Sequence, residues 1–91
     1  MALLDLLGRR WTLRIAWELR SAPLPFRELQ AACGGLSPSV LNTRLAELRT
    51  ARLVALGGEG YALTILGREL LELFVPVTEW AQRWARTLPS R

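Results

Sequence analysis

The chain has 91 residues, of which 51% are hydrophobic and 22% charged, so it suits one globular domain and is too apolar for a disordered segment. Twelve basic residues, all of them arginine, against eight acidic ones give a net charge of +4, which favours polyanionic partners such as nucleic acid or acidic lipid. One cysteine and no histidine exclude a four-ligand zinc site, a disulfide within the chain, and a Ser–His or Cys–His nucleophile. We therefore expect no enzyme, no metal site and no cofactor.

The first residues, MALLDLLGRRW, carry an apolar run that is too short for a signal peptide and is interrupted by Asp5. No run in the chain approaches the roughly 20 apolar residues of a membrane span. We therefore expect a cytoplasmic protein without a membrane partner.

The N-terminal third predicts three short helices. The leucines of LLDLL form the first, which ends at Gly8. Between Arg9 and Arg20 apolar residues recur at helical spacing, which predicts a second helix. The stretch SAPLP ends it, and Pro25 suits the first turn of a third helix, PFRELQAAC, since the missing N–H costs nothing there. Gly34 and Gly35 end that helix.

The segment GLSPSVLNTRLAELRT predicts a fourth helix directly after this turn. Ser37 is a good N-cap, and proline is favoured at the first helical position. One face of the helix is apolar, with Leu41, Leu45 and Leu48. The opposite face is small and polar. Two helices joined by a tight turn are the pattern of a helix-turn-helix.

The next stretch, LVALGGEGYALT, predicts a β-hairpin around GGEG. Thr64 is a candidate cap for a long last helix, along which apolar residues form one broad stripe. Pro76 lies inside that helix and should kink or locally break it.

These elements together predict a single winged helix-turn-helix domain over residues 1–91, mainly α with a small β-hairpin. The helix-turn-helix spans about 25–50 and the wing about 53–63. A long C-terminal dimerisation helix covers about 65–87.

The sequence also resembles one family, the HxlR-type transcriptional regulators. Four blocks resemble its pattern in order: LLDLLGRRWTLRIAWEL, PFREL, LSPSVLNTRLAELRTARLV and YALTILGRELL. The family's members are homodimeric winged helices related to the MarR group, and they bind promoter DNA. The resemblance therefore implies a cytoplasmic, sequence-specific regulator whose partners are double-stranded DNA and a second copy, with a small-molecule or redox effector left open.

Three departures from the family pattern bear on function. Arg52 stands where the family usually has glycine before LV, and Trp17 stands where a polar or basic residue is common. The GGEG wing is short and carries Glu59 in place of a basic residue. The acidic wing and Trp17 keep an alternative open, namely a winged-helix module that binds another protein and has lost DNA binding.

The polar face of the fourth helix supplies the candidate DNA-binding residues. Asn42 suits a bidentate contact to adenine, while Ser39 and Thr43 suit base edges or a thymine methyl group. The helix start at Ser37 and Ser39 suits a phosphate. The alternative is an ordinary solvated face.

Three arginines are candidate phosphate contacts: Arg44, Arg49 and Arg52. For Arg44 the alternative is an ion pair with Glu18 or Glu47 that buttresses the motif. For Arg49 and Arg52 it is a solvated charge.

The last helix carries more apolar surface than one small domain can cover, which predicts a dimer. The expected interface residues are Leu3, Leu4, Leu7, Leu70, Phe74, Val77, Trp80 and Trp84. Cys33 at the end of the third helix is a candidate redox sensor; the alternative is a core position in the turn.

Overall fold

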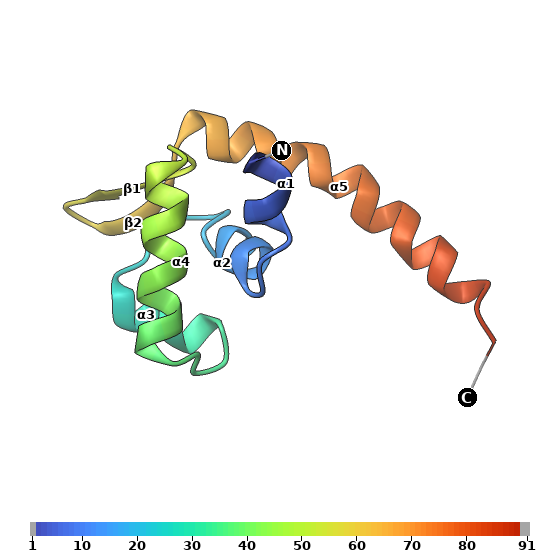
Figure 1. Cartoon of the computed structure of the whole chain (residues 1–91), viewed down its shortest axis with the longest axis horizontal. Helices are drawn as coiled ribbons and strands as arrows, with labels where there is room; N and C mark the ends of the chain where they lie inside the picture. Colours follow the sequence, from blue (N-terminus) through green and yellow to red (C-terminus); the bar gives the residue numbers. More distant parts are fainter. Residues whose placement is uncertain (1, 90–91) are drawn as a thin grey trace.

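The computed structural model describes residues 2–89; Met1, Ser90 and Arg91, which the predicted domain includes, lie outside this range. Four helices precede a hairpin, and a long helix follows it (Figure 1). In chain order the elements are α1 (Ala2–Leu7), α2 (Thr12–Glu18), α3 (Phe26–Ala32), α4 (Pro38–Thr50), β1 (Val54–Gly57), β2 (Gly60–Leu63) and α5 (Ile65–Arg86). The predicted fold class, a mainly helical winged helix-turn-helix, is confirmed.

The core lies where α2, α3 and α4 meet the base of the hairpin. Its central side chains are almost completely buried: Ile15, Leu19, Leu29, Leu41, Leu45 and Leu48. The three leucines of α4 are those predicted to face inward. Their burial fixes which face of α4 remains outside.

The turn of the helix-turn-helix is held by local hydrogen bonds. Gly34 and Gly35 adopt left-handed conformations, with φ of 79° and 80°. The Ser37 hydroxyl accepts from the Val40 N–H at 3.2 Å, so the predicted N-cap is confirmed. The Gln30 side-chain amide spans the turn and donates to the Leu36 carbonyl at 2.8 Å. The start of α4 is therefore fixed relative to α3.

The wing is a tight antiparallel hairpin in which Val54 pairs with Leu63 and Gly57 with Gly60. A third segment joins it: the backbones of Leu24 and Tyr61 exchange two hydrogen bonds, of 2.9 and 2.8 Å. Gly60 has φ of 116°, and a Cβ there would collide with the Leu24 backbone. The segment before α3 therefore ties the wing to the helical body, a contact that the sequence did not predict.

Three expectations about the helices need correction. The second helix does not begin near Arg9, because Trp11 takes a left-handed φ of 79° and α2 starts at Thr12. Pro25 is the N-cap of α3 and lies just before its first turn. The local break expected at Pro76 is absent, because α5 continues as one helix past the proline although Pro76 has no N–H to offer the Glu72 carbonyl; the kink expected as the alternative stays a prediction.

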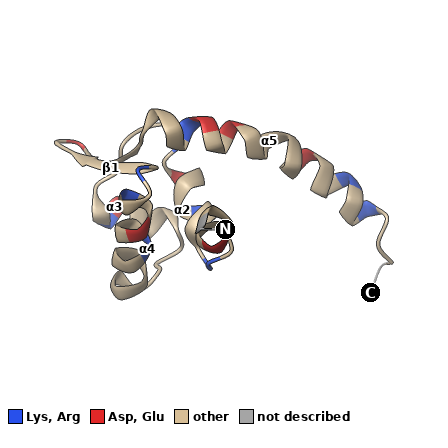
Figure 2. Cartoon of the chain, turned by 45° about the horizontal axis from the view of Figure 1, so that its top comes forward, with Lys and Arg blue, Asp and Glu red and all other residues tan. Residues whose placement is uncertain are grey.

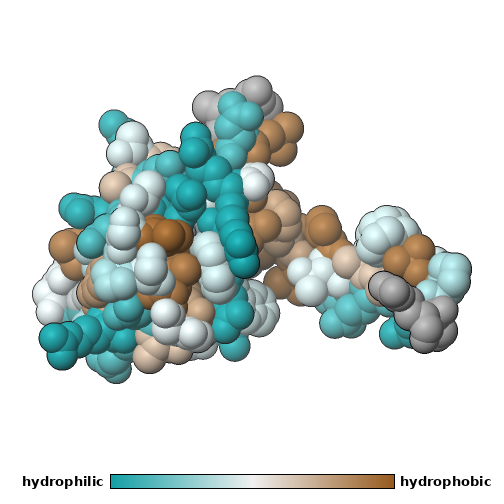
Figure 3. Space-filling view, turned by 60° about the horizontal axis from the view of Figure 1, so that its bottom comes forward, coloured by the Kyte–Doolittle hydropathy of each residue, from teal (hydrophilic) through white to brown (hydrophobic). Residues whose placement is uncertain are grey.

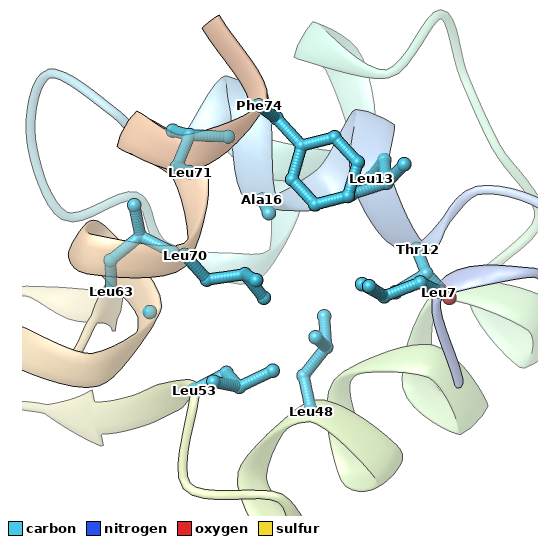
Figure 4. Close-up of a pocket in the computed structure, with 11 residues that line it drawn as sticks. Leu7, Thr12, Leu13, Ala16, Leu48, Leu53, Leu63, Leu70, Leu71 and Phe74 are labelled. Carbon is cyan, nitrogen blue, oxygen red and sulfur yellow. The ribbon is translucent and has the colours of Figure 1, made fainter. Parts of the chain in front are cut away.

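A small apolar cavity of about 10 Å³ lies where α1, α2, α4 and α5 meet (Figure 4). Leucines and Phe74 line most of it. The Thr12 side chain is also at this junction, 1% exposed, and its hydroxyl has no hydrogen-bond partner among the described residues.

Gly67 lets α5 approach the hairpin closely, since a Cβ there would collide with the Leu53 carbonyl. We therefore expect Gly67→Ala to destabilise the fold by about 1–3 kcal/mol through overpacking. Gly58→Ala is the matched control, because a Cβ there meets nothing within 4 Å and φ is not left-handed. Thermal unfolding followed by circular dichroism measures both. Equal melting temperatures for the two variants would contradict the close approach.

Candidate nucleic-acid interface

The outer face of α4 carries small, exposed polar side chains on a helix anchored by its leucines. Ser39, Asn42 and Thr43 are all exposed, as are Arg49 and Thr50 further along. In Figure 1 α4 stands at the front of the helical body, with the wing beside it. The predicted DNA-binding face is therefore open to solvent over the whole length of the helix.

The start of α4 offers one backbone donor to a ligand. Pro38 has no N–H, the Val40 N–H is bound by the Ser37 hydroxyl, and the Leu41 N–H bonds the Ser37 carbonyl. The Ser39 N–H has no hydrogen-bond partner in residues 2–89. Ser37 therefore acts first as a cap, and the first-turn donor left for an anion is the Ser39 amide.

The Thr43 hydroxyl is engaged within its own helix, donating to the Ser39 carbonyl at 3.0 Å. Its proton is thus committed, whereas its methyl group and the two lone pairs of its oxygen are not. Asn42 has no such bond in the described chain. The two neighbouring side chains therefore differ: Asn42 offers both donor and acceptor, and Thr43 offers mainly apolar contact.

Arg44 does not join the exposed polar face. Its guanidinium pairs with Glu47 at 2.7 Å and donates through Nε to the Arg10 carbonyl at 3.0 Å. This geometry matches the ion-pair alternative with Glu47. Glu18, the other partner considered, is instead bound by Arg14 at 2.8 Å.

Arg49 and Arg52 lie beside an open groove of about 620 Å³ between the C-terminal half of α4 and β1. Both side chains are exposed. Arg52 has a left-handed φ of 64°, and its carbonyl accepts from the Thr64 hydroxyl at 2.6 Å. A left-handed φ explains why glycine is the expected residue here, and the arginine adds a cation at the groove.

The charges of the chain are interspersed over the body and α5 (Figure 2). The tip of the hairpin is acidic, because Glu59 lies in the two-residue turn between β1 and β2. The cations of the groove therefore lie at the base of the wing, and its tip carries the opposite charge.

Cys33 is buried at the C-terminal end of α3, with 2% of its surface exposed. Burial raises the pKa of its thiol; Arg14 lowers this pKa in part, and Glu18 raises it further. The neutral thiol is thus favoured over the reactive thiolate at neutral pH. The environment is that of a core residue and disfavours the redox role.

The residues predicted for a dimer interface divide into two groups. Leu3 and Leu70 pack on the chain's own core, while Leu7, Leu70 and Phe74 line the small cavity. The others, Leu4, Val77, Trp80 and Trp84, are 50–63% exposed. Leu66 on α5 and Leu88, just after the end of α5, are exposed to a similar extent, by 55% and 48%. Leu73 is more exposed still, at 70%.

The exposed apolar residues lie along α5, which projects away from the helical body. Figure 3 shows apolar surface on this projecting part of the molecule. From Leu73 they recur every three or four residues, at Val77, Trp80 and Trp84. The two tryptophans stack, with ring centroids 6.2 Å apart. This spacing places the four side chains in one exposed apolar seam along α5.

No helix among residues 2–89 is both long and apolar enough to cross a bilayer.

Comparison with known proteins gives a consistent result. A family model described as HxlR-like helix-turn-helix matches residues 6–88. The chain is 30% identical to MJ0925 of Methanocaldococcus jannaschii, an uncharacterized HTH-type transcriptional regulator, over 92% of this chain and 83% of that protein. It is 31% identical to YvaP of Bacillus subtilis, described in the same words, over 88% and 81% of the two chains.

Two solved structures share the fold. Quinone-bound YodB from B. subtilis superposes with a TM-score of 0.84 at 31% identity, over 89% of this chain and 92% of that one. A possible HxlR family transcriptional factor from Thermoplasma volcanium superposes with a TM-score of 0.80 at 27% identity, over 92% and 82%.

Proposed function

This chain belongs to the HxlR-like helix-turn-helix family, whose members are transcriptional regulators and not enzymes, and from this premise we propose that it is a homodimer that places α4 in the major groove of its operator. DNA binding is what the family implies; the role of α4, the residues that contact DNA and the dimer are the proposal. The observation that carries it is the outer face of α4, a line of small polar side chains on a capped and anchored helix.

Asn42 is the principal base-reading residue of the proposed interface. Its exposed amide offers a donor and an acceptor, the pair that adenine presents in the major groove. Thr43 presents its methyl group beside it, because its hydroxyl is bonded to the Ser39 carbonyl. We expect this methyl group to meet a thymine methyl.

Phosphate contacts are assigned to two places that flank the base-reading residues. The Ser39 amide at the start of α4 meets one phosphate, supported by the positive end of the helix dipole. Arg49 and Arg52 meet another at the groove beside β1. The acidic tip of the wing lies away from the DNA phosphates in this arrangement, since they would repel the Glu59 carboxylate.

The proposed dimer forms through the exposed seam of α5 together with Leu4 of α1. Leu73, Val77, Trp80 and Trp84 are 50–70% exposed in the isolated chain, and burying large apolar side chains is worth about 1.5–3 kcal/mol each. A two-fold dimer also suits DNA, because it places two α4 helices about one duplex turn apart, ~34 Å.

The second candidate function, a module that binds protein and not DNA, is favoured by two observations. The wing tip is acidic, and Trp17 is 43% exposed, with the Arg20 guanidinium 4.0 Å above its ring. The DNA experiment below separates the two candidates.

We expect Asn42→Ala to weaken binding to the selected operator by about 1–3 kcal/mol, and to leave binding to random DNA nearly unchanged, since a base contact is lost. Gln82→Ala is the matched control, because it removes an exposed amide from α5 instead. The measurement is an electrophoretic mobility shift against DNA chosen from the gene's upstream region. Equal operator affinity in wild type and Asn42→Ala would show that the base-reading face is wrongly assigned. A wild type that binds no DNA would favour the protein-binding module.

We expect wild type to scatter light as a dimer, with about twice the chain mass of 10.2 kDa, and Val77→Glu to scatter as a monomer. The new carboxylate would lie in the apolar seam and lose its hydration on association. Gln82→Glu adds the same charge on the opposite side of α5 and should remain a dimer. A monomeric wild type at micromolar concentration would refute the dimer.

A further inference from the structure

Arg44 and Glu47 lie one turn apart on α4 and both contact the turn between α1 and α2. The Arg44 Nε donates to the Arg10 carbonyl at 3.0 Å, and its guanidinium pairs with one oxygen of Glu47 at 2.7 Å. The other Glu47 oxygen lies 3.4 Å from the Arg9 guanidinium. One arginine and one glutamate of α4 thus hold two successive residues of a segment that is distant in sequence.

The turn that they hold has an unusual backbone. Trp11 adopts a φ of 79°, a left-handed conformation that is uncommon for a bulky residue. Such conformations persist where surrounding contacts determine them. The carbonyl that Arg44 binds belongs to Arg10, directly before Trp11. The amide of Thr12, the residue after Trp11, donates to the Arg9 carbonyl at 3.3 Å, and α2 begins at Thr12.

The pair on α4 is partly shielded from water. The side chains of Arg44 and Glu47 are 19% and 26% exposed, against 51% for Arg9. Charged hydrogen bonds in such a setting are stronger than neutral ones and less screened by salt. Removing either partner would leave the other partly buried charge with one contact: Arg44 would keep the Arg10 carbonyl, and Glu47 would keep the more distant Arg9 guanidinium.

We propose that Arg44 and Glu47 form a clamp that positions α4 on the α1–α2 turn, and that Arg44 is a positioning residue and not a phosphate contact. The clamp joins α4, which carries Asn42, to the α1–α2 turn. This turn directly follows α1, which carries Leu4 of the proposed dimer interface. The clamp sets where the base-reading side chains stand relative to the second copy. Its effect on DNA affinity rests on the proposed function.

Replacing Glu47 gives opposite results for the two possible roles of Arg44, as a positioning residue or as a phosphate contact. Glu47→Ala removes a negative charge near DNA, so simple electrostatics, or an Arg44 released toward phosphate, would strengthen binding. The clamp instead requires operator binding to weaken, by about tenfold, the equivalent of one charged hydrogen bond. Operator affinity equal to or tighter than that of wild type would overturn the inference.

The salt dependence of binding separates positioning from phosphate contact. We expect Arg49→Gln to flatten the slope of log K against log salt by about 0.9, because one phosphate contact is lost. Arg44→Gln makes the same charge change on the same helix, and we expect lower affinity with the wild-type slope. A slope flattened in Arg44→Gln as in Arg49→Gln would make Arg44 a phosphate contact.

A third measurement needs no DNA. Hydrogen exchange of the Thr12 amide reports opening of the clamped turn, and we expect it to speed up by about tenfold in Arg44→Gln and Glu47→Ala relative to Arg49→Gln. Equal exchange rates in Arg44→Gln and Arg49→Gln would refute the clamp whether or not DNA is bound. A wild type that binds no DNA, with exchange still faster in the clamp variants, would refute only the proposed function.

Discussion

The burial of Leu41, Leu45 and Leu48 is the interaction on which the rest of the molecule depends. Each contributes about 1.5–3 kcal/mol relative to an exposed side chain. Because helical side chains at these spacings share one face, their burial also turns Ser39, Asn42 and Thr43 outward. Core packing and the surface proposed for DNA therefore lie on opposite sides of the same helix, so a substitution on the outer face costs the core little. The turn before α4 holds the start of the helix, and Arg44 and Glu47 contact the α1–α2 turn further along it.

The last helix divides its apolar residues in a comparable way. Gly67, Leu70, Leu71 and Phe74 face the body, where the absence of a side chain at Gly67 permits contact with Leu53. The seam from Leu73 to Trp84 faces away from it. One helix thus completes the core of its own chain and carries the surface proposed for a second copy. Continuity through Pro76 is important to this arrangement, since the seam crosses that position.

Signals confined to a few residues were sufficient to predict most of the fold. Ser37-Pro38 and Gly34-Gly35 mark helix ends through their own backbone chemistry, and the structure has those ends. Contacts between distant segments were not predictable in this way. Nothing near Trp11 requires a left-handed φ, and the partner that holds the turn, Arg44, lies far along the chain. The backbone bridge between Leu24 and Tyr61 was not predictable for the same reason, because it joins two segments that are far apart in the chain. For the site, the polar face followed from helical periodicity, whereas the division of the arginines between clamp and groove required the three-dimensional arrangement.

In the proposed complex, two α4 helices of a dimer enter adjacent major grooves on one face of the duplex. Hydroxyl-radical and methylation-interference footprinting on the bound operator tests it most directly. We expect two protected segments on the same face, with methylation of guanine N7 in the major groove interfering at each, and centres about 10 base pairs apart. A single protected segment, or interference confined to the minor groove, would contradict it.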